Sequence, residues 1–287
     1  MKISQQTRKS GKVFLVGAGP GDVELLTLKA ARLLASADVV LIDDLAGVDV
    51  LSLCPQARII HVGKRGGCKS TPQSFIEKLL VREAQAGHHV VRLKGGDVSL
   101  FGRASEEIAA LAAAGIEFEV VPGVTAGLAA AAQLKTSLTH RDHAHGVAFI
   151  TAHGAATAAS AAGAEIPWQA LAQSALTLVV YMGVARVASL QASLLAGGMR
   201  GDTPVIAVEN ASRADARYLC ATVATMVHDF AERQLKSPAV LVIGEAMAER
   251  AQQLAIEAMS GAEVAVGVSR VFANARRVFA NARRVVA

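Results

Sequence analysis

Short glycine-rich segments beside carboxylates are the parts of this chain whose residue types and spacing best suit ligand binding. Residues 17–22 (GAGPGD) and residues 95–97 (GGD) each follow a short apolar run. Glycine allows sharp turns and lets backbone N–H groups approach a ligand closely. The first segment has the spacing G-x-G-x-G, so the dinucleotide fingerprint G-x-G-x-x-G is incomplete. Asp43 ends the next apolar run, where an acid binds ribose in dinucleotide-binding folds, and this keeps an NAD(P)-dependent oxidoreductase open as an alternative.

Basic residues elsewhere suggest anion contacts rather than metal binding. Lys64 lies in residues 62–67 (VGKRGG), and Arg141 lies in residues 139–146 (THRDHAHG). A guanidinium pairs bidentately with carboxylates. The histidines around Arg141 lack the cysteines and acids of an ordinary zinc spacing, so no metal site is expected. The sequence has no P-loop, G-x-S-x-G or H-E-x-x-H motif, which argues against P-loop NTPases, serine hydrolases and zinc proteases.

Apolar runs alternate with helical periodicity along the chain. Strands are predicted at 12–17, 39–42, 58–62, 89–93, 119–121, 147–151, 176–181, 205–209 and 239–243, and helices at 25–34, 72–86, 105–114, 187–196, 223–233 and 246–258. In the first half, this alternation implies a parallel sheet with helices on its faces. We therefore expect two α/β domains, at 11–136 and 137–262, with a cleft between them.

Composition and charge limit the partners. The chain has 287 residues, of which 52% are apolar and 18% charged, enough for a substantial core. Its formal net charge is +5, but the last 18 residues hold five arginines and no acid, so the charges of the preceding residues balance. No nucleic-acid partner is expected, because the surplus lies in the tail and aromatic residues make up only 4%. The tail, 263–287, contains RVFANAR twice in succession and is expected to be disordered.

The sequence also bears on location. The N-terminal residues are polar and basic, and the longest uncharged stretch, 166–185, is interrupted by polar residues, so neither a secretory signal nor a membrane span is expected. Three cysteines form an odd and sparse set, which suits reduced thiols. We expect a cytoplasmic protein.

Nine segments, in order over most of residues 12–250, resemble the tetrapyrrole methylases. They are VGAGPGD (16–22), LTLKA (26–30), VGKR (62–65), VVRLKGGD (90–97), FGR (101–103), VPGVTAG (121–127), LTHRD (138–142), YMG (181–183) and PVIAVEN (204–210). The resemblance implies two α/β domains of the tetrapyrrole methylase type, with the methyl donor in the inter-domain cleft. It also implies a homodimer that methylates uroporphyrinogen III at two ring positions, giving precorrin-2. S-adenosyl-L-methionine would be the donor and S-adenosyl-L-homocysteine the second product.

The resemblance also assigns roles to individual residues of this chain. The implied donor contacts are Pro20, Gly95, Gly96, Asp97, Leu100, Thr125, Ala126, Met182, Ala211 and Ala239. The implied proton acceptor and donor are Asp43 and Lys64. The implied tetrapyrrole-binding residues are Arg103, Glu106 and Arg141.

The chain departs from the family pattern at a few positions. Val98 and Ser99 replace a proline and an aromatic residue, and Asp44 adds a second negative charge beside Asp43. Another methylase of the corrin pathway, and a binding protein that has lost turnover, therefore stay open as alternatives beside the oxidoreductase.

Overall fold

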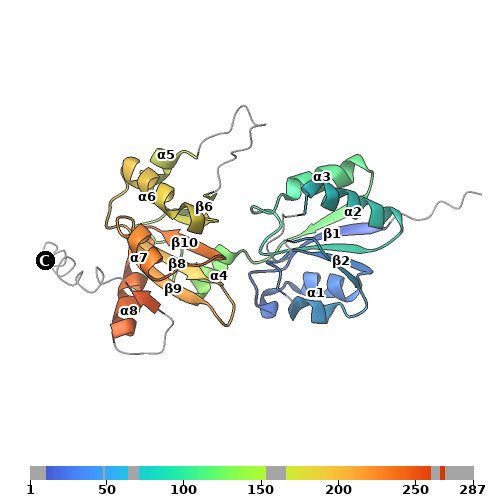
Figure 1. Ribbon diagram of the computed structural model, residues 1–287, viewed down its shortest axis with the longest axis horizontal. Coiled ribbons are helices and arrows are strands. Elements are labelled where there is room, and N and C mark those ends of the chain that lie inside the picture. The colour runs from blue at the N-terminus through green and yellow to red at the C-terminus, as the bar shows by residue number, and fades with distance from the viewer. Residues whose placement is uncertain (1–10, 48, 64–70, 153–165, 260–265, 269–287) are drawn as a thin grey trace, which may run out of the picture. The chain divides into compact units, whose positions relative to one another are not determined.

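The chain forms two compact units, Met1–Ala126 and Gly127–Ala287. The computed structural model describes residues 11–47, 49–63, 71–152, 166–259 and 266–268. Each unit contains one β-sheet covered by helices (Figure 1). The α/β class predicted from the sequence is therefore confirmed.

Unit 1 is built on five parallel strands. In chain order its elements are β1 (Lys12–Gly17), the 3-10 turn η1 (Val23–Leu25), α1 (Leu28–Ala35), β2 (Val39–Ile42), η2 (Asp49–Leu53), β3 (Arg58–His61), α2 (Gln73–Gln85), β4 (Val90–Lys94), α3 (Ala104–Ala113) and β5 (Glu117–Val121). The strand order is β3-β2-β4-β1-β5, and each pair is parallel. The central strands are largely apolar because helices cover both of their faces, and Arg92 and Lys94 of β4 are the charged exceptions among their buried residues.

The two faces of this sheet bury separate cores. Helices α2 and α3 cover one face, where Leu80 and Leu111 are fully buried against β1 and β4. Helix α1 lies on the opposite face (Figure 1). There Leu34 packs with Val40 and Val91, together with residues of η2. Chain connections therefore leave the sheet on both sides, which matters for the position of the site.

Unit 2 is built on a mixed sheet. Its elements are α4 (Ala126–Gln133), β6 (Gly146–Thr151), α5 (Trp168–Ala172), β7 (Leu176–Tyr181), η3 (Val184–Arg186), α6 (Val187–Ala196), β8 (Pro204–Glu209), β9 (Arg217–Thr222), α7 (Met226–Glu232), β10 (Ala239–Ile243), η4 (Glu245–Met247), α8 (Ala248–Met259) and β11 (Val266–Val268). The strand order is β11-β9-β8-β10-β7-β6. Strand β10 runs antiparallel to both neighbours, and β8 runs antiparallel to β9. The pairs β6–β7 and β9–β11 are parallel.

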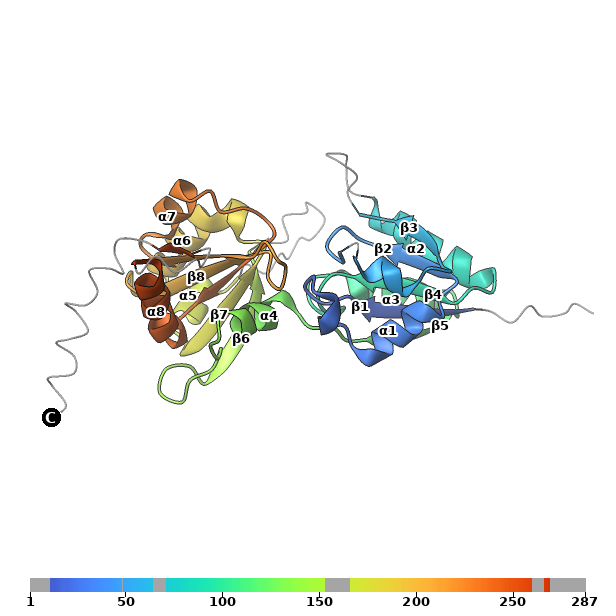
Figure 2. The same cartoon turned by 90° about the horizontal axis from the view of Figure 1, so that it is seen from below.

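Helix α4 packs within unit 2, beside β6 and β7 (Figure 2). The Gly127 backbone N–H donates to the Tyr181 hydroxyl at 2.9 Å, and the Ser212 N–H donates to the Gln133 side-chain oxygen at 2.7 Å. A Cβ atom on Gly127 would lie 2.6 Å from a Val179 methyl group, so the helix approaches the sheet closely. The two units divide after Ala126, the first residue of this helix, whereas the sequence analysis expects a boundary at 136/137.

Two strands of unit 2 were not predicted. Strand β9 has Arg217, Cys220 and Thr222 among its six residues, so it lacks a clear apolar run. Strand β11 pairs with β9 and lies inside the tail, 263–287, for which the sequence analysis expects disorder. The RVFANAR copies lie outside the described residues. Over the part of the chain that the structure describes, the helices are too short or too polar to cross a membrane.

Candidate active site

The carboxyl ends of β1 and β4 form the point where the connections of unit 1 diverge. These strands are neighbours in the sheet, yet β1 continues into α1 on one face and β4 continues into α3 on the other. Ligands of open α/β sheets bind at such a switch point, outside the carboxyl ends of the strands. The loops that follow are residues 18–22 and 95–103, so both glycine-rich segments singled out in the sequence lie here.

The two loops are hydrogen-bonded to each other. Gly96 N–H donates to the Gly19 carbonyl at 2.7 Å, and Gly19 N–H donates to the Gly96 carbonyl at 3.1 Å. The backbones also approach the loop after β5. A Cβ atom on Gly17 would lie 2.6 Å from the Gly123 nitrogen and 2.7 Å from the Gly96 oxygen. Glycine is required at these positions because three strand ends meet without room for side chains.

This arrangement does not suit a pyrophosphate. In dinucleotide-binding folds, free N–H groups of the glycine loop and of the following helix N-terminus hold the phosphates. Here the N–H groups of Gly19 and Gly96 bond the opposite loop. The Asp22 carboxylate caps η1 by accepting from Glu24 N–H at 2.9 Å, so an anion already occupies the helix start. The loops fit a ligand without phosphate, such as S-adenosylmethionine.

Apolar side chains beside the strand ends supply surfaces that an adenosyl group can contact. In unit 1, Leu45 follows β2 and is 55% exposed, and Phe101 lies in the β4 loop and is 37% exposed. Exposed apolar side chains near polar backbone groups are typical of small-molecule sites.

Asp97 shapes the site through its two carboxylate oxygens. Oδ1 accepts from Ser99 N–H at 2.8 Å, and Oδ2 accepts from Gly123 N–H at 2.9 Å. The residue therefore ties the β4 loop to the β5 loop. Pro20 and Leu100 are partly buried in the adjoining loops, and Thr125 is buried. The structure thus places the donor-contact residues predicted in unit 1 around neighbouring strand ends.

Asp43 lies at the carboxyl end of β2, the neighbour of β4. Its Oδ1 accepts from Leu45 N–H at 3.2 Å and from Gly95 N–H at 3.3 Å. Its Oδ2 lies 3.8 Å from a guanidinium nitrogen of Arg92, and its side chain is 26% exposed. The carboxylate is therefore held at the rim of the loops with one oxygen facing a buried cation.

Arg103 and Glu106 bind each other at the start of α3. Arg103 Nε and a terminal nitrogen donate to the two Glu106 oxygens at 2.7 and 2.6 Å, and both side chains are largely exposed. The hydrogen bond from Arg103 lowers the pKa of Glu106, and the Glu106 carboxylate raises the pKa of Arg103. The predicted tetrapyrrole-binding pair is thus a neutral ion pair that a substrate carboxylate could enter.

Backbone strain marks the same loops. The described residues include seven non-glycine residues with positive φ. Two of them, Lys135 and Gln234, follow helix ends, where left-handed residues are common. The others lie in loops that follow strands: Phe101 and Arg103 after β4 in unit 1, and Met182, Asn210 and Ser212 after β7 and β8 in unit 2. Such conformations cost about 1–3 kcal/mol each and cluster at functional sites.

The predicted donor contacts of unit 2 are brought together at one end of the neighbouring strands β7, β10 and β8. Tyr181 pairs with Val240 in the antiparallel register of β7 and β10, so Met182 lies next to Ala239. Ala239 pairs with Glu209 across β8, and Ala211 follows two residues later. These residues are separated by up to 57 positions in the sequence, and strand order alone makes them neighbours.

The remaining predicted residues are Lys64 and Arg141. Lys64 lies outside the described residues. Arg141 is exposed in the turn before β6, where the His140 and His143 rings stack with centroids 4.6 Å apart. Its guanidinium has no ion-pair partner within the described ranges, so it is available to an external anion.

The sequence analysis assigned no role to Arg92, Lys94 and Glu107. These three residues form a buried ion cluster beside Asp43. Arg92 and Lys94 are part of a segment that was noted only for its glycines. The sequence did contain a sign of this cluster. Two cations within a five-residue strand that is otherwise apolar require buried counter-charges.

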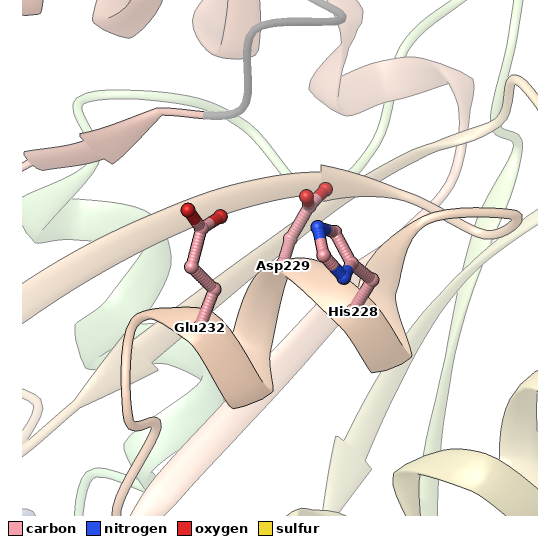
Figure 3. A group of neighbouring side chains, drawn as sticks. All are labelled: His228, Asp229 and Glu232. Atoms are coloured by element: carbon pink, nitrogen blue, oxygen red, sulfur yellow. The ribbon is translucent and has the colours of Figure 1, made fainter.

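A separate group of possible metal ligands lies on α7. His228, Asp229 and Glu232 each offer one ligand atom, and these atoms lie within 4.8 Å of one another (Figure 3). His228 and Glu232 are exposed and one helical turn apart, whereas Asp229 is buried. All three come from one short helix, none is among the predicted site residues, and we assign no metal to them.

Comparisons with known proteins point the same way. The family model of the tetrapyrrole (corrin/porphyrin) methylases matches residues 12–227. The uroporphyrinogen-III C-methyltransferase of Pseudomonas aeruginosa is 54% identical over 236 residues, which cover 82% of this chain and 94% of that protein. The structure of the uroporphyrin-III C-methyl transferase from Thermus thermophilus, complexed with S-adenyl homocysteine, is 40% identical with a TM-score of 0.70, and the match covers 83% of this chain and 100% of that one. A cobalt precorrin-4 methyltransferase is 27% identical with a TM-score of 0.72, over 82% of this chain and 95% of that one.

Proposed function

Because this chain belongs to the tetrapyrrole (corrin/porphyrin) methylases, we propose that it methylates uroporphyrinogen III at two ring positions. S-adenosyl-L-methionine is the donor, S-adenosyl-L-homocysteine leaves after each transfer, and precorrin-2 is the tetrapyrrole product. The relatives named for this substrate are 54% and 40% identical to the chain, whereas the cobalt precorrin-4 methyltransferase is 27% identical. This difference favours uroporphyrinogen III over a later corrin intermediate.

One structural observation supports a methyl donor over a dinucleotide most directly. The N–H groups of Gly19 and Gly96 bond the opposite glycine loop, and the Asp22 carboxylate accepts from Glu24 N–H at the start of η1. A pyrophosphate would meet the Asp22 carboxylate there, whereas S-adenosylmethionine has no phosphate and its net charge is positive. The NAD(P) alternative loses its principal binding feature.

The residues of the chain divide the work of the reaction. The donor supplies an electrophilic methyl group on its sulfonium, and the new carbon–carbon bond forms as the sulfur–carbon bond breaks. Arg103 and Arg141 bind carboxylates of the tetrapyrrole, with Glu106 releasing Arg103 as a substrate carboxylate enters. Asp43 accepts the proton that the methylated ring loses in exchange for the methyl cation. Lys64, the implied proton donor, would protonate one ring position while another ring position gives up a proton, so this shift leaves the proton count unchanged. The loops hold the reacting carbon in line with the methyl group and exclude water.

The proposed donor contacts are the ten residues that the family resemblance implies: Pro20, Gly95, Gly96, Asp97, Leu100, Thr125, Ala126, Met182, Ala211 and Ala239. We further propose that the protein acts as a homodimer in the cytoplasm without nucleic acid.

The test is an anaerobic incubation of the full chain with uroporphyrinogen III and S-adenosylmethionine, followed by mass spectrometry of the tetrapyrrole. A mass gain of two methyl groups is expected. No gain, although calorimetry detects donor binding, would mean that the chain binds the donor without turnover. Binding of NADH but not of S-adenosylmethionine would return the oxidoreductase.

A variant separates the two ligands. Arg141→Ala should weaken uroporphyrinogen III binding more than donor binding, because the exposed guanidinium faces no partner of its own in the described structure. Arg200→Ala is the matched control, since Arg200 is exposed in the same unit but pairs with Asp202 before β8. Equal losses for both ligands in Arg141→Ala would contradict the assignment.

A further inference from the structure

Four charged side chains form a cluster beneath the β4 loop, and Asp43 is its exposed member. Arg92 and Lys94 are two residues apart on β4, so their side chains leave the same face of the sheet. Glu107 of α3 is fully buried between them. Its Oε1 accepts from Arg92 Nε at 3.0 Å, and its Oε2 accepts from Lys94 Nζ at 2.9 Å. Each oxygen of one carboxylate therefore holds one cation.

A single carboxylate leaves these two cations with a surplus positive charge. Burial and the nearby Arg92 lower the pKa of Lys94, although Glu107 and Asp43 act in the opposite direction. The fourth member, Asp43, balances the cluster, because its Oδ2 lies 3.8 Å from the Arg92 guanidinium. The excess positive charge therefore faces Oδ2 of Asp43, since the backbone hydrogen bonds of this carboxylate go to Oδ1.

The guanidinium is fixed on its remaining sides. One terminal nitrogen of Arg92 donates to the Leu93 carbonyl at 2.9 Å and approaches the Leu41 carbonyl at 3.5 Å. Gly102, next to Arg103, leaves room for the Lys94 stem, since a Cβ atom there would lie 2.9 Å from Lys94 Cε. The cluster therefore joins β2, β4, α3 and the loop that carries Arg103.

Stability alone is a weak reason for such a cluster. Buried ion pairs are often matched or exceeded in stability by well-packed apolar side chains, because removing charges from water costs several kcal/mol per ion. An apolar set would complete the surrounding core, in which Leu80 and Leu111 are already fully buried. A cluster that ends on a partly exposed carboxylate at the switch point is better explained by a task at that carboxylate.

We propose that Glu107 is a positioning residue, which holds Arg92 against Asp43 and so orients the carboxylate that accepts the proton from the methylated ring. Lys94 balances the charge of Glu107 within the cluster. This inference rests on the proposed function, in which Asp43 is the proton acceptor.

The first test is Glu107→Gln, which keeps the shape of the side chain and removes its charge. We expect kcat for methyl transfer to fall about 10–100-fold, the range that misplacement of a reacting group produces. The donor Kd and the KM for uroporphyrinogen III should change less than about threefold, because the buried side chain contacts neither ligand. Glu107→Asp, which keeps the charge on a shorter stem, should recover part of kcat.

A second variant guards against simple loss of folding. Lys94→Met/Glu107→Leu removes one charge of each sign, so the buried charge stays balanced while Arg92 loses its hydrogen-bond acceptor on α3. Its kcat should stay low even when its urea midpoint recovers. Recovery of both would overturn the proposal, because Glu107 would then serve only as a counter-charge.

The matched control is Glu83→Gln. Glu83 is also a buried glutamate that pairs with two arginines, Arg58 and Arg82, but it lies on α2 away from the strand-end loops. Glu83→Gln should lower stability without changing kcat.

Asp43→Asn is measured in parallel. Full activity of Asp43→Asn would refute the proton-acceptor role itself, whereas an inactive Asp43→Asn beside a fully active Glu107→Gln would refute only the positioning role.

Discussion

Replacing Asp97 with alanine tests whether this carboxylate shapes the donor loop or contacts the donor directly. The variant loses two hydrogen bonds, from Ser99 N–H at 2.8 Å and from Gly123 N–H at 2.9 Å. Ser99 is exposed, so its N–H can bond to water, and its loss counts little. Gly123 packs against the backbones of Gly17 and Gly96, so its N–H is left poorly solvated. A hydrogen bond to a charged group contributes about 1.5–3 kcal/mol, and we expect Asp97→Ala to cost about 2–3 kcal/mol.

The assay combines urea unfolding with calorimetric titration of S-adenosylmethionine. The urea midpoint of Asp97→Ala should fall with an unchanged slope, and donor affinity should fall because the β4 and β5 loops are no longer joined. Asp38→Ala is the matched control. Asp38 accepts a backbone hydrogen bond from His89 N–H at 2.7 Å, at the amino ends of β2 and β4, away from the strand-end loops of the site. It should lose stability and keep donor affinity.

One result would refute the reasoning about Asp97. If Asp97→Ala unfolds at the wild-type urea concentration yet no longer binds the donor, then the carboxylate contacts the donor and does not hold the loops together. Asp97→Asn helps to decide, since its single side-chain oxygen can still accept from Gly123 N–H. Under the loop-shaping account it should retain part of both stability and affinity.

Three further predictions concern other parts of the chain. Gly17→Ala should cost about 3 kcal/mol or prevent folding, because its Cβ would lie 2.6 Å from a backbone nitrogen; a wild-type urea midpoint would contradict this. Burial raises the pKa of Cys220 to about 12, so iodoacetamide at pH 8 should leave it unmodified in the native protein and alkylate it in urea, as mass spectrometry can check. Burial alone would raise the pKa of Glu209, but hydrogen bonds from Arg217 and the Lys236 N–H lower it below 4.5. Its contribution to stability is therefore complete above about pH 4.5 and is lost as the pH falls through the lowered pKa, so Glu209→Gln should flatten the acid decline of Tm, and an unchanged decline would count against it.

The sequence by itself predicted the local elements and the loops that bear the site. Short apolar runs such as 12–17 and 39–42 predict buried strands, and both strands are present. Glycines predict the turn that follows the first of them. The family was predicted from nine short segments and is confirmed by the family model. These features depend on neighbours within a few residues of one another, so they can be recognised without knowing strand order.

The tertiary structure decided which of these segments meet. Strand order makes the loops after β1 and β4 hydrogen-bond each other, although about 75 residues separate them in the chain. Strand β9 has no strong local period, and β11 is held by pairing with it, so neither was predictable from local pattern. Arg92 and Lys94 looked like isolated charges because their partner, Glu107, is supplied by the next helix. Long-range pairing of charges and backbones depends on packing energies summed over the whole unit, and no local stretch of residues contains that information.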